Sequence, residues 1–343
     1  MHAGWRLFAL QALIPAAVIG LLVWRVPLGE MKDAVENANP VFLALAFPLF
    51  LASNYIAAIR TKLSLHRMGE VPLIPLFEMF LVSFMVNSLV PLRIGDVMRV
   101  QILSNRYHLR RAGVASAVFV TGALFDGAAF TFLFIWTLAF FGAPSVVVSL
   151  AWTFSGLLLI GLVLAAIFAR VRLEEGWEDR SPLRALPERL RDSLGRLVPE
   201  ALHGLAILAD ARLALRGFML SLAAWTLQAG MYWAFGRALG VHLSLADAVL
   251  VMIAGAMIMS VHLVPTSIGV YEGTITGLLA ALGLSGAEAL AYAIGTHLLL
   301  IAFGLLAGGV SMWRLRISTH DIFVMGRRVL VEGPPEMEAA ASG

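Results

Sequence analysis

The sequence contains no cysteine and few charged residues. Without cysteine, disulfide bonds, thiolate metal sites and cysteine nucleophiles are all excluded. Charged residues make up only 14% of the 343 residues, whereas hydrophobic residues make up 60% and the mean hydropathy is +0.86. A typical soluble domain has about 25% charged residues. The composition therefore predicts a polytopic membrane protein and leaves no room for a soluble catalytic domain.

Familiar catalytic and nucleotide-binding motifs are also missing from the sequence. It has no HExxH, no GxSxG, no P-loop and no GxGxxG followed by a ribose-binding acid. We therefore expect no enzyme, no cofactor, no metal ion and no ATP-driven transport by this chain alone. The net charge is only +3, and the basic residues gather in particular loops. This distribution indicates membrane topology and argues against a nucleic-acid partner.

Long apolar runs predict an all-α fold with about six full membrane spans, because a helix needs about 20 residues to cross the bilayer core. We expect one transmembrane domain over residues 1–315 with a cytoplasmic insert at 170–216, and a partly disordered cytoplasmic tail at 316–343. Leucines at helical spacing in 183–196 predict a basic helix, which either lies on the membrane surface or links two spans in solvent. The predicted spans are 5–26, a retained first helix, and then 41–59, 113–141, 145–169, 217–239 and 287–313.

A seven-residue phrase, L-V-P-x-x-I-G, occurs twice, at residues 89–95 and 263–269. In each copy, proline ends an apolar run and glycine follows where the backbone can turn freely. The copies interrupt two further apolar stretches, 74–105 and 246–284. Two interrupted hydrophobic segments at corresponding places in two halves are typical of a transporter binding site. The alternative is two ordinary loop turns that match by coincidence.

The distribution of basic residues predicts how the interrupted stretches run. Lysine and arginine number three in 60–73, five in 93–111, nine in 170–216 and four after residue 313. Basic loops stay cytoplasmic, so the stretch 74–105 is predicted to dip into the membrane and return to the same side. The same reasoning makes 246–284 a dip from the outer face. Two re-entrant helical hairpins then form an inverted repeat whose tips meet near the midplane, and both chain termini are cytoplasmic.

Ionisable side chains at membrane depth are costly and are functional candidates. The first predicted hairpin holds Asn87, Arg93, Asp96 and Arg99, and two arginines around one carboxylate leave a net positive charge. A guanidinium binds phosphate through a planar fork of donors, so these four residues are predicted to bind an anionic headgroup. Alternatively, the two arginines are interface anchors that extend to the headgroups. Glu78 is predicted to be a gating or proton-linked acid.

The second predicted hairpin supplies the rest of the candidate site. Thr266, Ser267, Tyr271 and Glu272 are predicted to contact the substrate, and Glu272 is also predicted to pair with an arginine of the first hairpin. His262 is a candidate proton carrier, although a histidine at such a place is more often hydrogen-bonded packing.

Polar residues also occur inside the predicted full spans. Asp126 is a candidate for a gating or proton-linked role, as are Glu272, His262 and Glu78. It should face the protein interior or a wet cavity. Helix–helix hydrogen bonds are expected from five weaker candidates, namely Asn54, Tyr55, Gln228, Tyr232 and His297.

Residues 87–99 resemble the N-x-x-x-P-x-R-x-G-[ED]-x-x-R signature of the lysylphosphatidylglycerol synthase transmembrane, or flippase-like, family. Residues 264–272 look like the family's second element, P-x-x-x-G-x-x-E, and the resemblance extends over about residues 5–315. It implies a bacterial or archaeal inner-membrane protein that moves lipids or lipid-linked intermediates between leaflets. One branch of the family carries a fused soluble aminoacyl-lipid synthase domain. No such domain is found in this sequence, so the resemblance implies only the flippase-like part.

The sequence departs from the family pattern in one place. The resemblance implies E-R-x-x-D in the helix that follows the first motif, but residues 122–126 read G-A-L-F-D, which keeps only Asp126. This departure puts in doubt any mechanism that needs the missing Glu–Arg pair.

Together these patterns predict a multi-pass protein of the cytoplasmic membrane that binds an anionic phospholipid or a polyprenyl-phosphate-type lipid and moves it between leaflets. A homodimer is compatible with the sequence. Two alternatives stay open, which are an intramembrane lipid-modifying transferase and a non-transporting accessory subunit of a glycolipid or hopanoid pathway.

Overall fold

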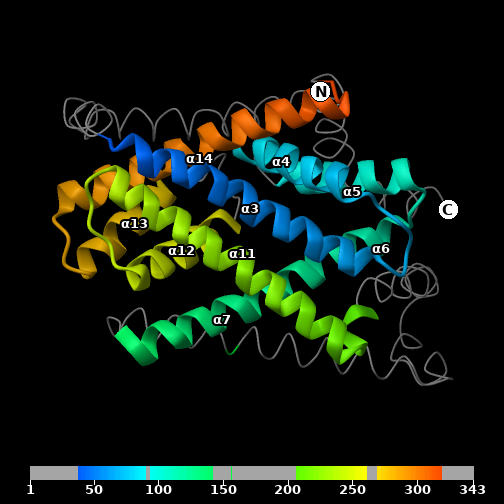
Figure 1. Cartoon of the computed structure of the whole chain (residues 1–343), viewed down its shortest axis with the longest axis horizontal. Coiled ribbons are helices and arrows are strands. Elements are labelled where there is room, and N and C mark those ends of the chain that lie inside the picture. Colours follow the sequence, from blue (N-terminus) through cyan, green and yellow to red (C-terminus); the bar gives the residue numbers. More distant parts are fainter. Residues whose placement is uncertain (1–37, 90–92, 142–155, 157–205, 261–268, 319–343) are drawn as a thin grey trace, which may run out of the picture.

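The computed structural model describes residues 38–89, 93–141, 156, 206–260 and 269–318, and every regular element within these ranges is a helix (Figure 1). The predicted all-α class is confirmed for this part of the chain. Several predicted features lie outside the described residues, namely the spans 5–26 and 145–169 (except residue 156), the helix 183–196 and the tail beyond residue 318.

Two long helices, α3 (Pro40–Leu65) and α11 (Ala211–Ala238), lie side by side and run antiparallel (Figure 1). Asn39 N donates to Ala238 O (2.8 Å) at one end, and Ser53 Oγ donates to Gln228 Oε1 (2.8 Å) near the middle. Both helices are longer than predicted, because α3 continues past residue 59 and α11 begins before residue 217. Residues 211–216 of the predicted insert therefore belong to α11.

Two further segments of the chain form long helices. Helix α6 (Arg111–Ala115) continues through a π-helical turn, η1 (Ser116–Val120), into α7 (Thr121–Phe141), and α14 runs over Gly286–Leu315. Among the described residues, three helices are long and apolar enough to cross a bilayer, namely Pro40–Leu65, Arg111–Phe140 and Gly286–Leu315. Large apolar side chains such as Trp313, which is 80% exposed, cover the outer surface, as expected where lipid is the solvent.

Each interrupted stretch forms two short helices. The first consists of α4 (Leu73–Leu89) and α5 (Ile94–Tyr107), and the second of α12 (Leu245–Ser260) and α13 (Val270–Ala281). The two members of each pair pack together. Figure 1 shows α4 and α5 toward one end of the bundle, and α12 and α13 toward the other. Residues 90–92 of the first copy of the repeated phrase and residues 263–268 of the second copy lie outside the described residues.

Glycine allows α4 and α14 to pack in close contact. A Cβ atom on Gly308 would lie 2.4 Å from Met85 Cβ and 2.7 Å from Leu81 O, so the two helices approach at a distance that only glycine permits. The neighbouring Gly309 would place its Cβ in open space. Farther along the same contact, Arg314 Nε donates to Glu78 Oε1 (2.6 Å).

We predict that Gly308→Ala destabilises the protein and Gly309→Ala does not. The first methyl group would overpack the contact between α4 and α14, at a cost of about 1–3 kcal/mol. The second would cost less than about 0.5 kcal/mol. Thermal unfolding of the purified protein in detergent measures both variants. Equal unfolding midpoints for the two would contradict the close packing.

Candidate functional site

A polar cavity of about 600 Å³ lies inside the helical bundle. Its walls come from α3, α4, α5, α7, α11, α12, α14 and the π-helical turn. Asn87 and Arg93 border it at the break between α4 and α5, and Met259 borders it at the end of α12. The break between α4 and α5 and the end of α12 therefore border one cavity.

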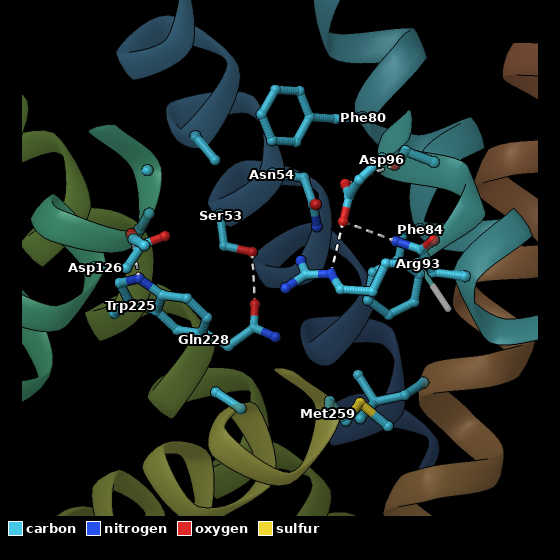
Figure 2. Close-up of a pocket in the computed structure, with 18 of the residues that line it drawn as sticks. Ser53, Asn54, Phe80, Phe84, Arg93, Asp96, Asp126, Trp225, Gln228 and Met259 are labelled. Atoms are coloured by element: carbon cyan, nitrogen blue, oxygen red, sulfur yellow. Dashed lines mark hydrogen bonds and ion pairs between the residues drawn. The ribbon is translucent and has the colours of Figure 1, made fainter. Parts of the chain in front are cut away.

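Figure 2 shows how the polar side chains of this cavity are arranged. Asp96 and Arg93 lie on one side, and Asp126 and Trp225 on the other. Between them lies the hydrogen-bonded pair of Ser53 and Gln228 (Figure 2).

Asp96 is the centre of the first cluster and is only 4% exposed. Its Oδ1 accepts hydrogen bonds from Ser83 Oγ (2.9 Å) and Arg99 Nη2 (3.0 Å). Its Oδ2 accepts from Arg93 Nε (2.8 Å) and Asn87 Nδ2 (3.2 Å). This buried carboxylate therefore joins the end of α4 to the start of α5.

The break between α4 and α5 fixes the position of Asp96. Gly95 N donates to Asn87 Oδ1 (2.8 Å), and a Cβ atom on Gly95 would lie 2.3 Å from Ser83 O, so only glycine fits there. Arg93, the residue before α5, has a left-handed backbone with φ of 54°. That conformation costs roughly 1–3 kcal/mol in a non-glycine residue. Strain of this size is most often found at functional sites.

The two arginines of this cluster differ in accessibility. The Arg93 side chain is 44% exposed, whereas the Arg99 side chain is 8% exposed. The guanidinium of Arg99 lies 3.9 Å from the centre of the Phe80 ring, a cation–π contact. Its Nε is buried without a hydrogen-bond partner. A buried donor without an acceptor is costly, so Arg99 has a hydrogen bond to offer a ligand.

Asp126 forms a second ion-paired cluster with Arg60 of α3. Asp126 Oδ1 accepts hydrogen bonds from Arg60 Nη1, Trp225 Nε1 (2.7 Å) and Ser221 Oγ (3.1 Å). The expectation that Asp126 faces the interior or a cavity is confirmed. The prediction that the span ends at residue 59 and leaves Arg60 in a loop is wrong. Arg60 belongs to α3 and is only 6% exposed.

Arg60 also bears on the departure from the family pattern at residues 122–126. A Cβ atom on Gly122 would lie 3.6 Å from Arg60 Nη2, so the arginine side chain occupies the space beside this glycine. Arg60 of α3 thus places a cation beside this part of α7.

Glu272 pairs with a histidine, so the predicted pairing with an arginine of the first hairpin is wrong. Its Oε1 lies 2.6 Å from His297 Nδ1, and its Oε2 accepts from Gly269 N (2.6 Å) at the start of α13. Tyr271 is fully buried beside them, with its ring 4.6 Å from the His297 ring and its hydroxyl 3.3 Å from Thr296 Oγ1. His297 lines the cavity, whereas Tyr271 and Glu272 lie behind it.

The structure brings together most of the described candidates. Asn87, Arg93, Asp96, Arg99 and Asp126 line the cavity. Of the weaker candidates, Asn54, Gln228, Tyr232 and His297 also line it, whereas Tyr55 packs edge-on against Phe77.

Other predicted site residues lie elsewhere. Glu78 is not part of the cavity wall and pairs with Arg314 at the contact between α4 and α14. Thr266, Ser267 and His262 fall outside the described residues. Sequence reasoning missed Arg60, Ser83 and Trp225. Arg60 carried a detectable signal, because a basic residue within one turn of a predicted span end can belong to the span.

Three arginines and two aspartates give the cavity wall one surplus positive charge. Electrostatic interactions are stronger in a low-dielectric interior than in water. The arrangement is suited to binding a small anion that can accept several hydrogen bonds.

Residues 8–308 match the model of a protein family described as "Lysylphosphatidylglycerol synthase TM region". The match covers most of the chain and the whole cavity wall. The chain belongs to this family. A UPF0104 membrane protein from Methanothermobacter thermautotrophicus is 24% identical over 301 residues, which cover 81% of this chain and 85% of the relative. The resemblance in residues 87–99 is thereby confirmed, and the chain is a multi-pass membrane protein of the lysylphosphatidylglycerol synthase transmembrane type.

We predict energetic coupling between Arg60 and Asp126. Removing either partner leaves the other charge unpaired inside the bundle, so Arg60→Met and Asp126→Leu should each destabilise the protein. The double variant should be more stable than the sum of the single effects by about 0.5–3 kcal/mol.

Chemical or thermal unfolding in detergent measures this coupling. Asp247 supplies the control, because it caps the start of α12 through Ser244 and lies outside the cavity wall. Arg60→Met combined with Asp247→Asn should show additive losses. Additive losses for Arg60 and Asp126 would rule out a stabilising pair.

Proposed function

We propose that this protein binds the phosphate-bearing headgroup of an anionic lipid in the cavity and moves it between the two leaflets. The observation that carries the proposal is the set of three arginines, Arg60, Arg93 and Arg99, around a cavity inside an apolar bundle. Charged residues at membrane depth are rare and usually belong to substrate pathways.

The size and charge of the cavity favour a lipid headgroup. Small-molecule sites commonly measure about 300–1,000 Å³, and about 600 Å³ is enough for a headgroup while the acyl chains stay in the bilayer. A phosphodiester carries one negative charge, and the three arginines of the cavity wall outnumber its two aspartates. Arg93 and Arg99 can bind its oxygens through planar forks of donors.

The Asp96 cluster would keep the empty site stable. In the structure, Asp96 accepts hydrogen bonds from both Arg93 and Arg99. A phosphate would share these donors and would also accept from the unpartnered Nε of Arg99. The headgroup would thereby gain hydrogen bonds without leaving a buried carboxylate unpaired.

The two broken stretches would provide the conformational change. Helices α4 and α12 have 17 and 16 residues and reach about 25 Å at 1.5 Å per residue, less than the roughly 30 Å of a bilayer core. We propose that each pair of short helices is a re-entrant hairpin, that the two enter from opposite faces, and that both chain termini are cytoplasmic. Movement of either helix pair would then open the cavity toward one leaflet.

Arg93 and Arg316 offer a matched test of this function. Both arginines have a left-handed backbone, with φ of 54° and 56°, but only Arg93 lines the cavity. Asparagine tolerates this conformation, so Arg93→Asn and Arg316→Asn remove one charge each with little backbone strain. We predict that Arg93→Asn slows translocation about tenfold or more, because a hydrogen bond to a charged group contributes about 1.5–3 kcal/mol. Arg316→Asn should retain the wild-type rate.

Purified protein in vesicles that carry fluorescent phosphatidylglycerol in one leaflet provides the measurement. Equal rates for the wild type and protein-free vesicles would refute transport of this lipid. Chemically modified lipid with an unchanged leaflet distribution would instead support an intramembrane transferase. Neither movement nor modification would support an accessory subunit.

A further inference from the structure

A buried histidine–glutamate pair lies at the edge of the cavity. His297 of α14 lines the cavity and is only 2% exposed, and its Nδ1 lies 2.6 Å from Glu272 Oε1. The other ring nitrogen, Nε2, is buried without a hydrogen-bond partner. The cavity chemistry described above does not use this nitrogen.

The contact with Glu272 determines which nitrogen can take up a proton. A carboxylate only accepts hydrogen bonds, so Nδ1 carries hydrogen and donates to Glu272. Glu272 is held in place by Gly269 N, which donates to its other oxygen (2.6 Å). In neutral His297, Nε2 therefore carries a lone pair. One added proton turns this acceptor into a donor at the cavity wall.

The ionisable groups close to His297 come from helices α11, α13 and α14. From α13, Glu272 binds Nδ1, and Tyr271 stacks on the ring with its hydroxyl near Thr296. From α11, the ionisable side chain at the same part of the cavity wall is Tyr232, while Tyr292 of α14 donates to the Tyr232 carbonyl. Helix α12 contributes no ionisable side chain to the described part of the wall.

The other charges of the cavity come from helices α3, α5 and α7. They are Arg60, Arg93, Asp96, Arg99 and Asp126, and each of the two aspartates is paired with arginine. When Glu272 is included, three arginines balance three carboxylates while His297 is neutral. Protonation of His297 then gives the described site one surplus positive charge.

We propose that His297 Nε2 takes up one proton when an anionic headgroup binds, so that the lipid anion and the proton occupy the cavity together. The inference rests on the proposed function and adds a coupling ion to it. The proton comes from water and forms an Nε2–H bond, while Nδ1–H stays on the ring and Glu272 stays ionised. A phosphate oxygen accepts the new hydrogen bond, and the charge of the bound lipid is neutralised.

Calorimetric titration of the purified protein with phosphatidylglycerol measures this proton directly. Titrations in phosphatidylcholine nanodiscs, in two buffers of different ionisation enthalpy, give the number of protons taken up per lipid between pH 5.5 and 8.5. We expect uptake to approach one proton at the alkaline end. Above the pH at which the empty site loses its proton, affinity should fall about tenfold per pH unit.

Two histidine variants assign the proton to a residue. His297→Gln keeps a hydrogen-bond donor without a titrating group, so it should bind phosphatidylglycerol with a pH-independent affinity. His242→Gln is the control, because His242 is exposed in the loop between α11 and α12, and it should behave as the wild type. If His297→Gln keeps the wild-type pH dependence, the assignment is wrong.

The titration of the wild-type protein also distinguishes failure of this inference from failure of the proposed function. It does not depend on whether any variant folds. Lipid binding without proton uptake at any pH would overturn the proton site and leave lipid binding intact. No phosphatidylglycerol binding at any pH would overturn both. Phosphatidylcholine should show no binding in either case, because its headgroup carries no net charge.

Discussion

The need to pair each buried carboxylate inside the helical bundle organises this structure. Asp96 lies in a polar cavity within an apolar bundle, and an unpaired carboxylate there would cost several kcal/mol. Its four side-chain partners come from α4 and α5, so the two short helices are held together at their break. Asp126 likewise ties α7 to α3 and α11 through Arg60, Ser221 and Trp225.

Features set by local sequence could be predicted. Asp96 and Arg99 are three residues apart, and the start of α5 places them on one helical face. The phrase around residues 89–95 correctly predicted a break between two helices, since proline and glycine act on the backbone directly. The long apolar runs predicted α3, α7, α11 and α14, although their ends were off by several residues.

Pairings between distant segments could not be predicted. Arg60 and Asp126 are 66 positions apart, and Glu272 and His297 are 25 apart, so their contacts depend on how separate helices pack. The predicted end of a span at 59 excluded Arg60 from the membrane, although α3 continues to Leu65. The predicted ion pair between Glu272 and an arginine of the first stretch rested on charge alone. In the structure, Arg93 and Arg99 of that stretch both bind Asp96.

The two interrupted stretches share a seven-residue sequence phrase but contribute different chemistry. The first contributes Arg93 and Arg99, which keep their charge at any physiological pH. The second contributes Glu272, which accepts a hydrogen bond from Nδ1 of His297, a residue of the cavity wall. The cavity wall therefore combines permanent cations with one imidazole. In the proposed proton-coupled binding, uptake of a proton by His297 would raise the affinity of this cavity for an anionic headgroup, and loss of that proton would lower it.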